Sequence, residues 1–171
     1  MTVLAVRALS KSFGGVHAVN EASFTIGAGE FLAMIGPNGA GKSTCFNMIN
    51  GQLAPDSGEI LLEGTDIAGL APREVWRRGV GRTFQVAATF ASMTVIENVQ
   101  MALISHAGET YRLWKPAGSR HRQGALDLLE QVGMRGAADR PSRELAYGDV
   151  KRIELAIALA NRPKLLLMDE P

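Results

Sequence analysis

The residues best suited to do chemistry lie in one short segment, where glycines are followed by a lysine and a serine. Gly36, Gly41, Lys42 and Ser43 fit the pattern Gly-x-x-x-x-Gly-Lys-Ser/Thr. Glycines let the backbone wrap closely around a phosphate, so that successive N–H groups point into one concavity. The lysine can then hold the β- and γ-phosphates, and the serine hydroxyl can ligate Mg²⁺. The pattern predicts a P-loop rather than a chance glycine-rich turn. The residues expected to contact nucleotide are Gly36, Pro37, Asn38, Gly39, Ala40, Gly41, Lys42, Ser43 and Thr44.

A second candidate element closes the sequence, where an apolar run ends in two carboxylates. Leu165–Met168 is followed by Asp169 and Glu170. A buried parallel strand delivers its carboxyl end to the ligand site of an open α/β sheet. There Asp169 can hold Mg²⁺, and Glu170 can polarise the attacking water as a general base. The alternative is a core strand that ends in a solvated acidic turn, and the P-loop favours the functional interpretation.

The elements that must position these residues can be read from the hydrophobic pattern. The nearly continuous apolar run at residues 31–35 predicts a strand covered on both faces, and residues 43–49 predict a helix, so the P-loop joins a strand to a helix. Strands are expected at residues 3–13, 22–26, 59–62 and 80–84, and helices at 72–78, 94–105, 120–132 and 150–161. The order predicts an α/β fold. We expect an antiparallel β region on the N-terminal side and a helical region inserted before the last strand.

Composition excludes several classes of protein. The 171 residues are 46% apolar and 20% charged, which is typical of a globular domain rather than a disordered chain. The net charge of +1 provides no field for gathering nucleic acid. No apolar stretch is long enough to span a membrane, and the start has no signal-peptide pattern. The single cysteine, Cys45, fits a reducing cytoplasm and is interpreted as a small buried residue.

Taken in order, these motifs resemble those of the ATP-binding subunits of ABC transporters. Residues 36–44 look like their P-loop, 82–85 like their Q-loop, 145–149 like their signature motif and 165–171 like their Walker B strand. The resemblance implies a P-loop NTPase core that binds ATP and Mg²⁺ and hydrolyses ATP. It assigns Phe13 to stacking on adenine, although a core Phe beside a glycine turn remains the alternative. It also assigns Gln85 to contact with Mg²⁺ or the attacking water. Lys42, Gln85 and Glu170 are then the catalytic residues, and Ser43, Gln85 and Asp169 are the metal ligands.

The signature segment departs from the usual Leu-Ser-Gly-Gly-Gln of this family. It consists of Leu145, Ala146, Tyr147, Gly148 and Asp149. Ala146 lacks the usual hydroxyl, yet the following helix can still present N–H groups to a phosphate. In the family that phosphate belongs to ATP on the opposite subunit, which implies a homo- or heterodimer. The Ala-Tyr-Gly-Asp variant is similar to that of branched-chain amino acid importers. That likeness implies two transmembrane permease subunits, a substrate-binding protein and a place on the inner face of the cell membrane.

The resemblance also predicts how the chain is divided. Residues 1–85 and 162–171 are expected to form the nucleotide-binding core, and residues 86–161 the helical signature subdomain. Leu165–Met168 suits a central strand that needs neighbours on both sides, and none of the histidines His17, His106 and His121 follows it. We therefore expect the C-terminal part of the sheet and the switch histidine to be missing, and the isolated chain to turn over little ATP. The alternatives are a nucleotide-binding fragment without turnover and a nucleic-acid- or ribosome-associated ABC ATPase. A P-loop kinase or GTPase explains residues 145–149 least well.

Overall fold

A long antiparallel hairpin begins the chain and sets the plan of its N-terminal part. The computed structural model describes residues 1–83, 89–108 and 121–168. It divides into two compact units, Met1–Val80 and Gly81–Pro171. The elements of the first unit are β1 (Thr2–Phe13), β2 (Val16–Gly27), α1 (Lys42–Ile49), β3 (Ser57–Leu62), β4 (Thr65–Asp66) and α2 (Pro72–Arg77). The strands form one sheet in the order β2-β1-β3-β4, with antiparallel neighbours throughout, which confirms the predicted antiparallel β region.

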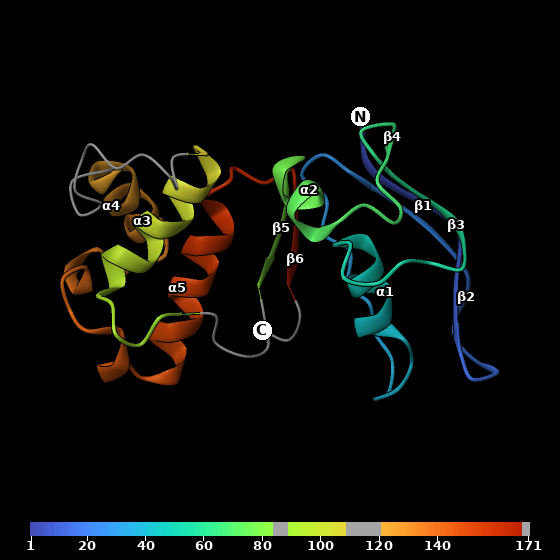
Figure 1. Cartoon of the computed structure of the whole chain (residues 1–171), viewed down its shortest axis with the longest axis horizontal. Helices are drawn as coiled ribbons and strands as arrows, with labels where there is room; N and C mark the ends of the chain where they lie inside the picture. Colours follow the sequence, from blue (N-terminus) through green and yellow to red (C-terminus); the bar gives the residue numbers. More distant parts are fainter. Residues whose placement is uncertain (84–88, 109–120, 169–171) are drawn as a thin grey trace. The chain divides into compact units, whose positions relative to one another are not determined.

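Helix α1 lies beside this sheet (Figure 1). Its buried residues are Cys45, Met48 and Ile49, one helical turn apart or adjacent on one face. The buried hydrophobic core also includes Leu4, Val6 and Leu9 of strand β1, each 1% exposed or less. The prediction that Cys45 is a small buried residue is confirmed. Burial raises the pKa of its thiol to about 11, so the thiol stays protonated and unreactive at neutral pH.

One predicted strand is wrong. Residues 31–35 form no strand, and Phe31 and Ile35 are 95% and 94% exposed. The apolar run predicted burial on both faces, but a strand also needs hydrogen-bonding neighbours. Within the described part of the first unit, no strand is paired with this segment. The hydrophobic pattern indicates that a segment suits a buried strand, but it does not indicate whether a neighbouring strand is there to pair with it.

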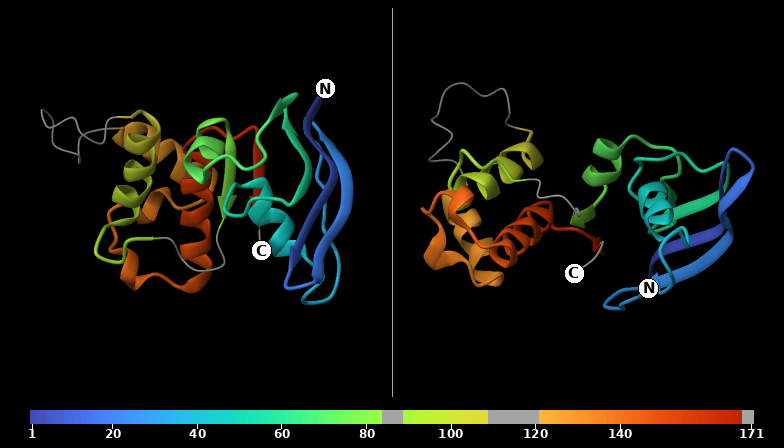
Figure 2. Two further views of the ribbon diagram at one scale, coloured as in Figure 1. Left: turned by 45° about the vertical axis from the view of Figure 1, so that its right-hand side comes forward. Right: turned by 90° about the horizontal axis from the view of Figure 1, so that it is seen from below.

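The second unit is mainly helical. Its elements are β5 (Val80–Thr83, beginning at the boundary), α3 (Val95–His106), α4 (Arg122–Gln131), α5 (Tyr147–Leu159) and β6 (Leu165–Met168), with 3₁₀ turns at Arg135–Ala137 and Ser142–Glu144. The three helices pack together, and β5 pairs with β6 in a two-stranded sheet (Figures 1 and 2). The helices and strands predicted here are confirmed, with boundaries shifted by up to three residues.

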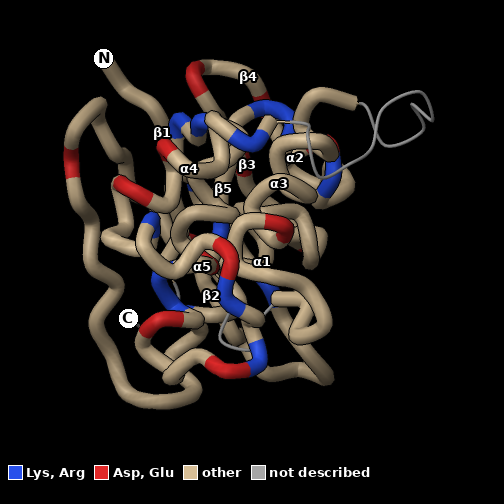
Figure 3. Tube along the Cα trace, turned by 90° about the vertical axis from the view of Figure 1, so that its left-hand side faces the viewer, with Lys and Arg blue, Asp and Glu red and all other residues tan. Residues whose placement is uncertain are grey.

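Charged residues are interspersed along the described chain. Acidic and basic positions both occur along the trace (Figure 3). This distribution agrees with the net charge of +1. No helix among the described residues has both the length and the apolar character needed to cross a bilayer.

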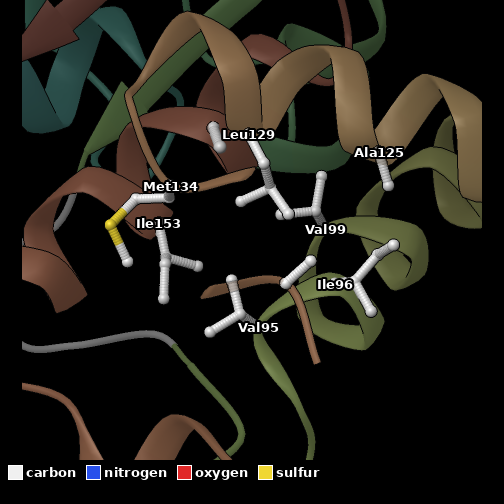
Figure 4. Close-up of a cluster of buried hydrophobic side chains, with 9 residues drawn as sticks. Val95, Ile96, Val99, Ala125, Leu129, Met134 and Ile153 are labelled. Carbon is white, nitrogen blue, oxygen red and sulfur yellow. The ribbon is translucent and has the colours of Figure 1, made fainter. Parts of the chain in front are cut away.

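The core of the second unit joins its three helices. It is built from Val95, Ile96, Val99, Ala125, Leu129, Met134, Ala138, Ile153 and Ala156 (Figure 4). Helix α3 begins in a capping box, in which the Thr94 side chain accepts from the Glu97 backbone N–H while Glu97 accepts from the Thr94 N–H at 2.8 Å. The bond from the Thr94 N–H and a second one from the Thr94 hydroxyl at 2.9 Å lower the pKa of Glu97, because both stabilise the ionised carboxylate. Local capping and the shared core together place the signature helix α5 against α3 and α4.

Candidate nucleotide-binding site

The P-loop is an exposed loop closed by its own lysine. Gly39 and Gly41 have φ values of +86° and +82°, a backbone conformation that glycine adopts without steric penalty. The Lys42 ammonium donates to the carbonyl oxygens of Gly36 and Pro37 at 2.6 and 2.9 Å. The lysine therefore turns back over the loop that it follows. This places its charge beside the backbone expected to surround a phosphate.

Helix α1 begins directly at that lysine. Its N-cap residue is Gly41, which has no side chain to accept from the first N–H groups. The first regular bond of the helix runs from the Cys45 N–H to the Gly41 carbonyl at 2.9 Å. The earlier N–H groups and the positive end of the helix dipole can therefore serve an anion. Ser43, in the first turn, is exposed and can present its hydroxyl as an oxygen ligand.

Gly41 has a second role that the motif does not reveal. A Cβ built on this residue would lie 2.0 Å from the carbonyl oxygen of Ala18 in β2. Only glycine allows the start of α1 to approach the strand so closely. The close contact fixes the P-loop beside the end of the β1–β2 hairpin, since Ala18 lies two residues after Val16, the first residue of β2.

Phe13 is the last residue of β1 and pairs with Val16 across the hairpin turn. The turn residues Gly14 and Gly15 have φ values of +52° and +86°, as a two-residue hairpin loop requires. Phe13 is 50% exposed, so its ring is not a core side chain. Its exposure and its position near α1 suit a side chain that stacks on a base.

Sequence reasoning missed the residues that surround this ring. The Lys11 ammonium lies 5.8 Å from the centre of the Phe13 ring and 2.6 Å from Asp56 Oδ1. A signal was available, because residues two apart in a strand project from the same face. No sequence signal indicated that Asp56, in the turn before β3, meets that pair.

The signature segment forms the start of α5, which begins three residues earlier than predicted. Ala146 is the N-cap residue, and its methyl group cannot cap the helix. Tyr147, Gly148 and Asp149 are in the first turn, with Tyr147 72% exposed. The Lys151 ammonium lies 5.5 Å from the centre of the Tyr147 ring and 3.1 Å from the buried carboxylate of Glu154. The segment thus presents an exposed aromatic ring and a helix N-terminus at one place.

The remaining predicted site residues follow strands β5 and β6. Gln85, Asp169 and Glu170 lie outside the described residues. The two strands run in the same direction (Figure 1), so their carboxyl ends lie at one edge of the small sheet. In the described ranges, no group of three or more His, Cys, Asp or Glu side chains could hold a metal ion. The assignments of the individual site residues stay predictions.

Comparison with known proteins decides the family. The sequence profile of the family described as "ABC transporter" matches residues 19–171. The chain belongs to this family. As a member, it is an ABC ATPase with the α/β fold of P-loop NTPases, and proteins of this family hydrolyse ATP to power transport. The fold class and the enzyme class predicted from the motifs are confirmed.

Individual relatives agree with this assignment. This ABC ATPase is 41% identical to the high-affinity branched-chain amino acid transport ATP-binding protein LivG of Salmonella typhimurium, covering 99% of this chain and 69% of LivG. It is 39% identical to the corresponding protein BraF of Pseudomonas aeruginosa, with the same coverage. An ATP-binding cassette solved in its ADP conformation is 32% identical over 100% of this chain and 69% of that one, with a TM-score of 0.86.

Proposed function

We propose that this ABC ATPase is the ATP-hydrolysing subunit of an importer for branched-chain amino acids. The observation that carries the proposal is the P-loop geometry within a chain that matches LivG and BraF along almost its whole length. The Ala-Tyr-Gly-Asp signature variant supports the same subfamily. The cargo is selected by the permeases and the binding protein, so its assignment here rests on the similarity of the ATPase to LivG and BraF.

In the proposed site, ATP phosphates bind to the loop and to the start of α1. Lys42 exchanges its hydrogen bonds to the Gly36 and Pro37 carbonyls for bonds to β- and γ-phosphate oxygens, and its charge stays at the same place. The first N–H groups of α1 stabilise the negative charge that develops on the transferred phosphoryl group. Each of these contacts comes from backbone or side chain within residues 36–44.

A hydroxyl in the first turn of α1 fits a magnesium ligand, because Mg²⁺ prefers oxygen donors. We propose Ser43 as that ligand, with Asp169 and Gln85 completing the protein's contribution. Mg²⁺ supplies charge neutralisation between the β- and γ-phosphates when it is bound. Glu170 is proposed to accept the proton of the attacking water, and Gln85 to orient that water. Strands β5 and β6 support the grouping of Gln85 with Asp169 and Glu170, since both strands end at one edge of their sheet.

The proposed active form is a dimer of ATPase subunits on two transmembrane permeases. In that form residues 145–149 contact the ATP bound by the other subunit. The uncapped start of α5 suits this role, since its N–H groups are not covered by an N-cap side chain. The subunit then works at the inner face of the membrane as a peripheral protein, and no nucleic-acid partner is expected. The division into a nucleotide-binding core and a helical signature subdomain is proposed with it.

Two measurements test the proposal. Purified protein should bind ATP and hydrolyse it slowly, and Lys42→Ala should reduce that turnover by at least about 100-fold, as loss of a preorganised charge in phosphoryl transfer does. ATP binding without turnover would favour the nucleotide-binding fragment instead, and strong salt-dependent binding to RNA or DNA would favour a non-transport ABC ATPase.

The cargo is tested in cells. Deletion of the gene should abolish uptake of labelled leucine, and the wild-type gene but not Lys42→Ala should restore it. Normal leucine uptake in the deletion strain would refute the assignment to branched-chain amino acids while leaving the ATPase assignment intact.

A further inference from the structure

The ring of Phe13 lies on one side against an ion pair between Lys11 and Asp56. Lys11 and Phe13 project from the same face of β1, and the Lys11 ammonium lies 5.8 Å from the ring centre. That ammonium also donates to Asp56 Oδ1 at 2.6 Å, and the Lys11 side chain is only 15% exposed. A cation within about 6 Å of an aromatic ring is attracted to its face. The contact therefore places a cation over one face of the ring, while Phe13 stays 50% exposed and accessible to a stacking partner.

The backbone beside the ring is fixed as well. The Ser12 N–H donates to Asp56 Oδ2 at 2.8 Å, so one carboxylate binds both the Lys11 ammonium and the main chain next to Phe13. The Ser12 hydroxyl and His17 Nδ1 are 2.9 Å apart across the hairpin. Hydrogen bonds from Lys11 and Ser12 lower the pKa of Asp56, which is the direction expected for a carboxylate held in its ionised form.

The same hairpin lies next to the P-loop. The approach of Gly41 to the Ala18 carbonyl places the start of α1 beside β2, a few residues from the Phe13–Val16 pair. A phosphate group at the P-loop and a base on Phe13 can therefore belong to one nucleotide. The arrangement provides a platform whose ring is oriented before the base arrives.

We propose that Lys11 and Asp56 are positioning residues for nucleotide binding, which hold the Phe13 ring as a preoriented platform for the base. The inference rests on the proposed function, because it requires that the P-loop binds the phosphates of the same nucleotide. An exposed aromatic side chain loses rotamer freedom when it stacks on a ligand, and a ring that is already fixed loses less. Lys11 and Asp56 thus increase affinity through the base and not through the phosphates.

The test compares two ligands that share phosphates and differ in the base. ATP and inorganic triphosphate, each with Mg²⁺, are titrated calorimetrically into the purified protein. Lys11→Met keeps the apolar stem and removes the cation. It should weaken ATP binding by about 2- to 5-fold and leave triphosphate binding unchanged. A purely structural loss would weaken both ligands together, so the ratio of the two affinities is the decisive quantity.

A double-mutant cycle shows whether Lys11 acts through the ring. In a Phe13→Leu background, Lys11→Met should no longer change the ratio, because the ring that it positions is absent. Lys11→Arg keeps a cation over the ring and an ion pair with Asp56, so it should retain the wild-type ratio. If Lys11→Met does not fold, Asp56→Asn provides the second variant, since it releases the ammonium and should shift the ratio in the same direction.

Arg7→Met is the matched control. Arg7 is also in β1 and forms an exposed ion pair with Glu59 at 3.3 Å, so this variant removes a cation and an ion pair from the same strand. It should leave both affinities unchanged. Equal weakening of ATP and triphosphate by Lys11→Met, or the same ratio change in the Phe13→Leu background, would overturn the inference. A wild-type protein that binds neither ligand would instead refute the proposed nucleotide function, and the inference with it.

Discussion

Gly41→Ala should destabilise the first unit far more than an ordinary P-loop substitution. The residue has φ +82°, and an added Cβ would lie 2.0 Å from the Ala18 carbonyl oxygen and 3.2 Å from Val19 Cγ2. A left-handed conformation costs an L-residue about 1–2 kcal/mol. Overpacking adds about 1–3 kcal/mol, because the carbonyl belongs to β2 and cannot move without disturbing the sheet. We expect a total of about 2–5 kcal/mol.

Gly39→Ala separates the two contributions. Gly39 lies in the same loop with φ +86°, but a Cβ there would have nothing within 4 Å. It should therefore show only the conformational penalty of about 1–2 kcal/mol. Urea denaturation without nucleotide, monitored by circular dichroism, measures the free energy of unfolding of both variants. In thermal denaturation, the melting temperature should fall by about 2–4 °C for each kcal/mol lost. Equal destabilisation by the two substitutions would show that the close approach of Gly41 to Ala18 adds nothing to the cost of Gly41→Ala.

Three further substitutions test the fold. Thr94→Ala removes the capping box of α3 and should cost about 1 kcal/mol in urea denaturation; an unchanged midpoint would mean that the cap is replaced by water. Asn98 is 3% exposed, and Asn98→Ala removes the hydrogen-bonding partner of the polar groups around it. The substitution should lower the free energy of unfolding by about 2–4 kcal/mol, and a loss below about 1 kcal/mol would contradict this expectation. The pKa of Asp56 lies below its ordinary 3.8, so its stabilising effect is present above that pH and is lost as the pH falls through the lower folded value. Asp56→Asn should accordingly be less stable than wild type near pH 7, and the difference should shrink below about pH 3.8; a difference independent of pH would refute this.

The sequence predicted the local elements of the site better than their neighbours. The P-loop pattern and helix α1 follow from glycine, lysine and a short apolar helix, all local features. The strand expected at residues 31–35 was wrong because pairing depends on a distant segment. The contact between Gly41 and Ala18 is likewise invisible in the pattern, since nothing in the residue types of β2 indicates that a helix start approaches one of its carbonyls.

The start of α5 illustrates the same limit. The hydrophobic period indicated a helix from residue 150, but the helix begins at Tyr147 and includes the signature residues in its first turn. Periodicity cannot detect an initial turn whose side chains are exposed. The capping residue that usually indicates a helix start is replaced here by Ala146.

The placement of the signature segment depends on a buried amide in α3. Asn98 accepts from the Phe90 N–H at 2.7 Å, and its two amide hydrogens are shared among the Phe90 and Thr94 carbonyls and Ser142 Oγ. The Ser142 N–H in turn donates to the Met93 carbonyl at 3.0 Å.

These bonds join two irregular segments, residues 90–94 before α3 and the 3₁₀ turn that leads into residue 145. Neither segment has a periodic hydrophobic face that could hold it by packing alone. A buried amide with all its partners satisfied can specify one arrangement where apolar contacts would allow several. We therefore expect a substitution at Asn98 to alter the lead-in to the signature as well as the stability of α3.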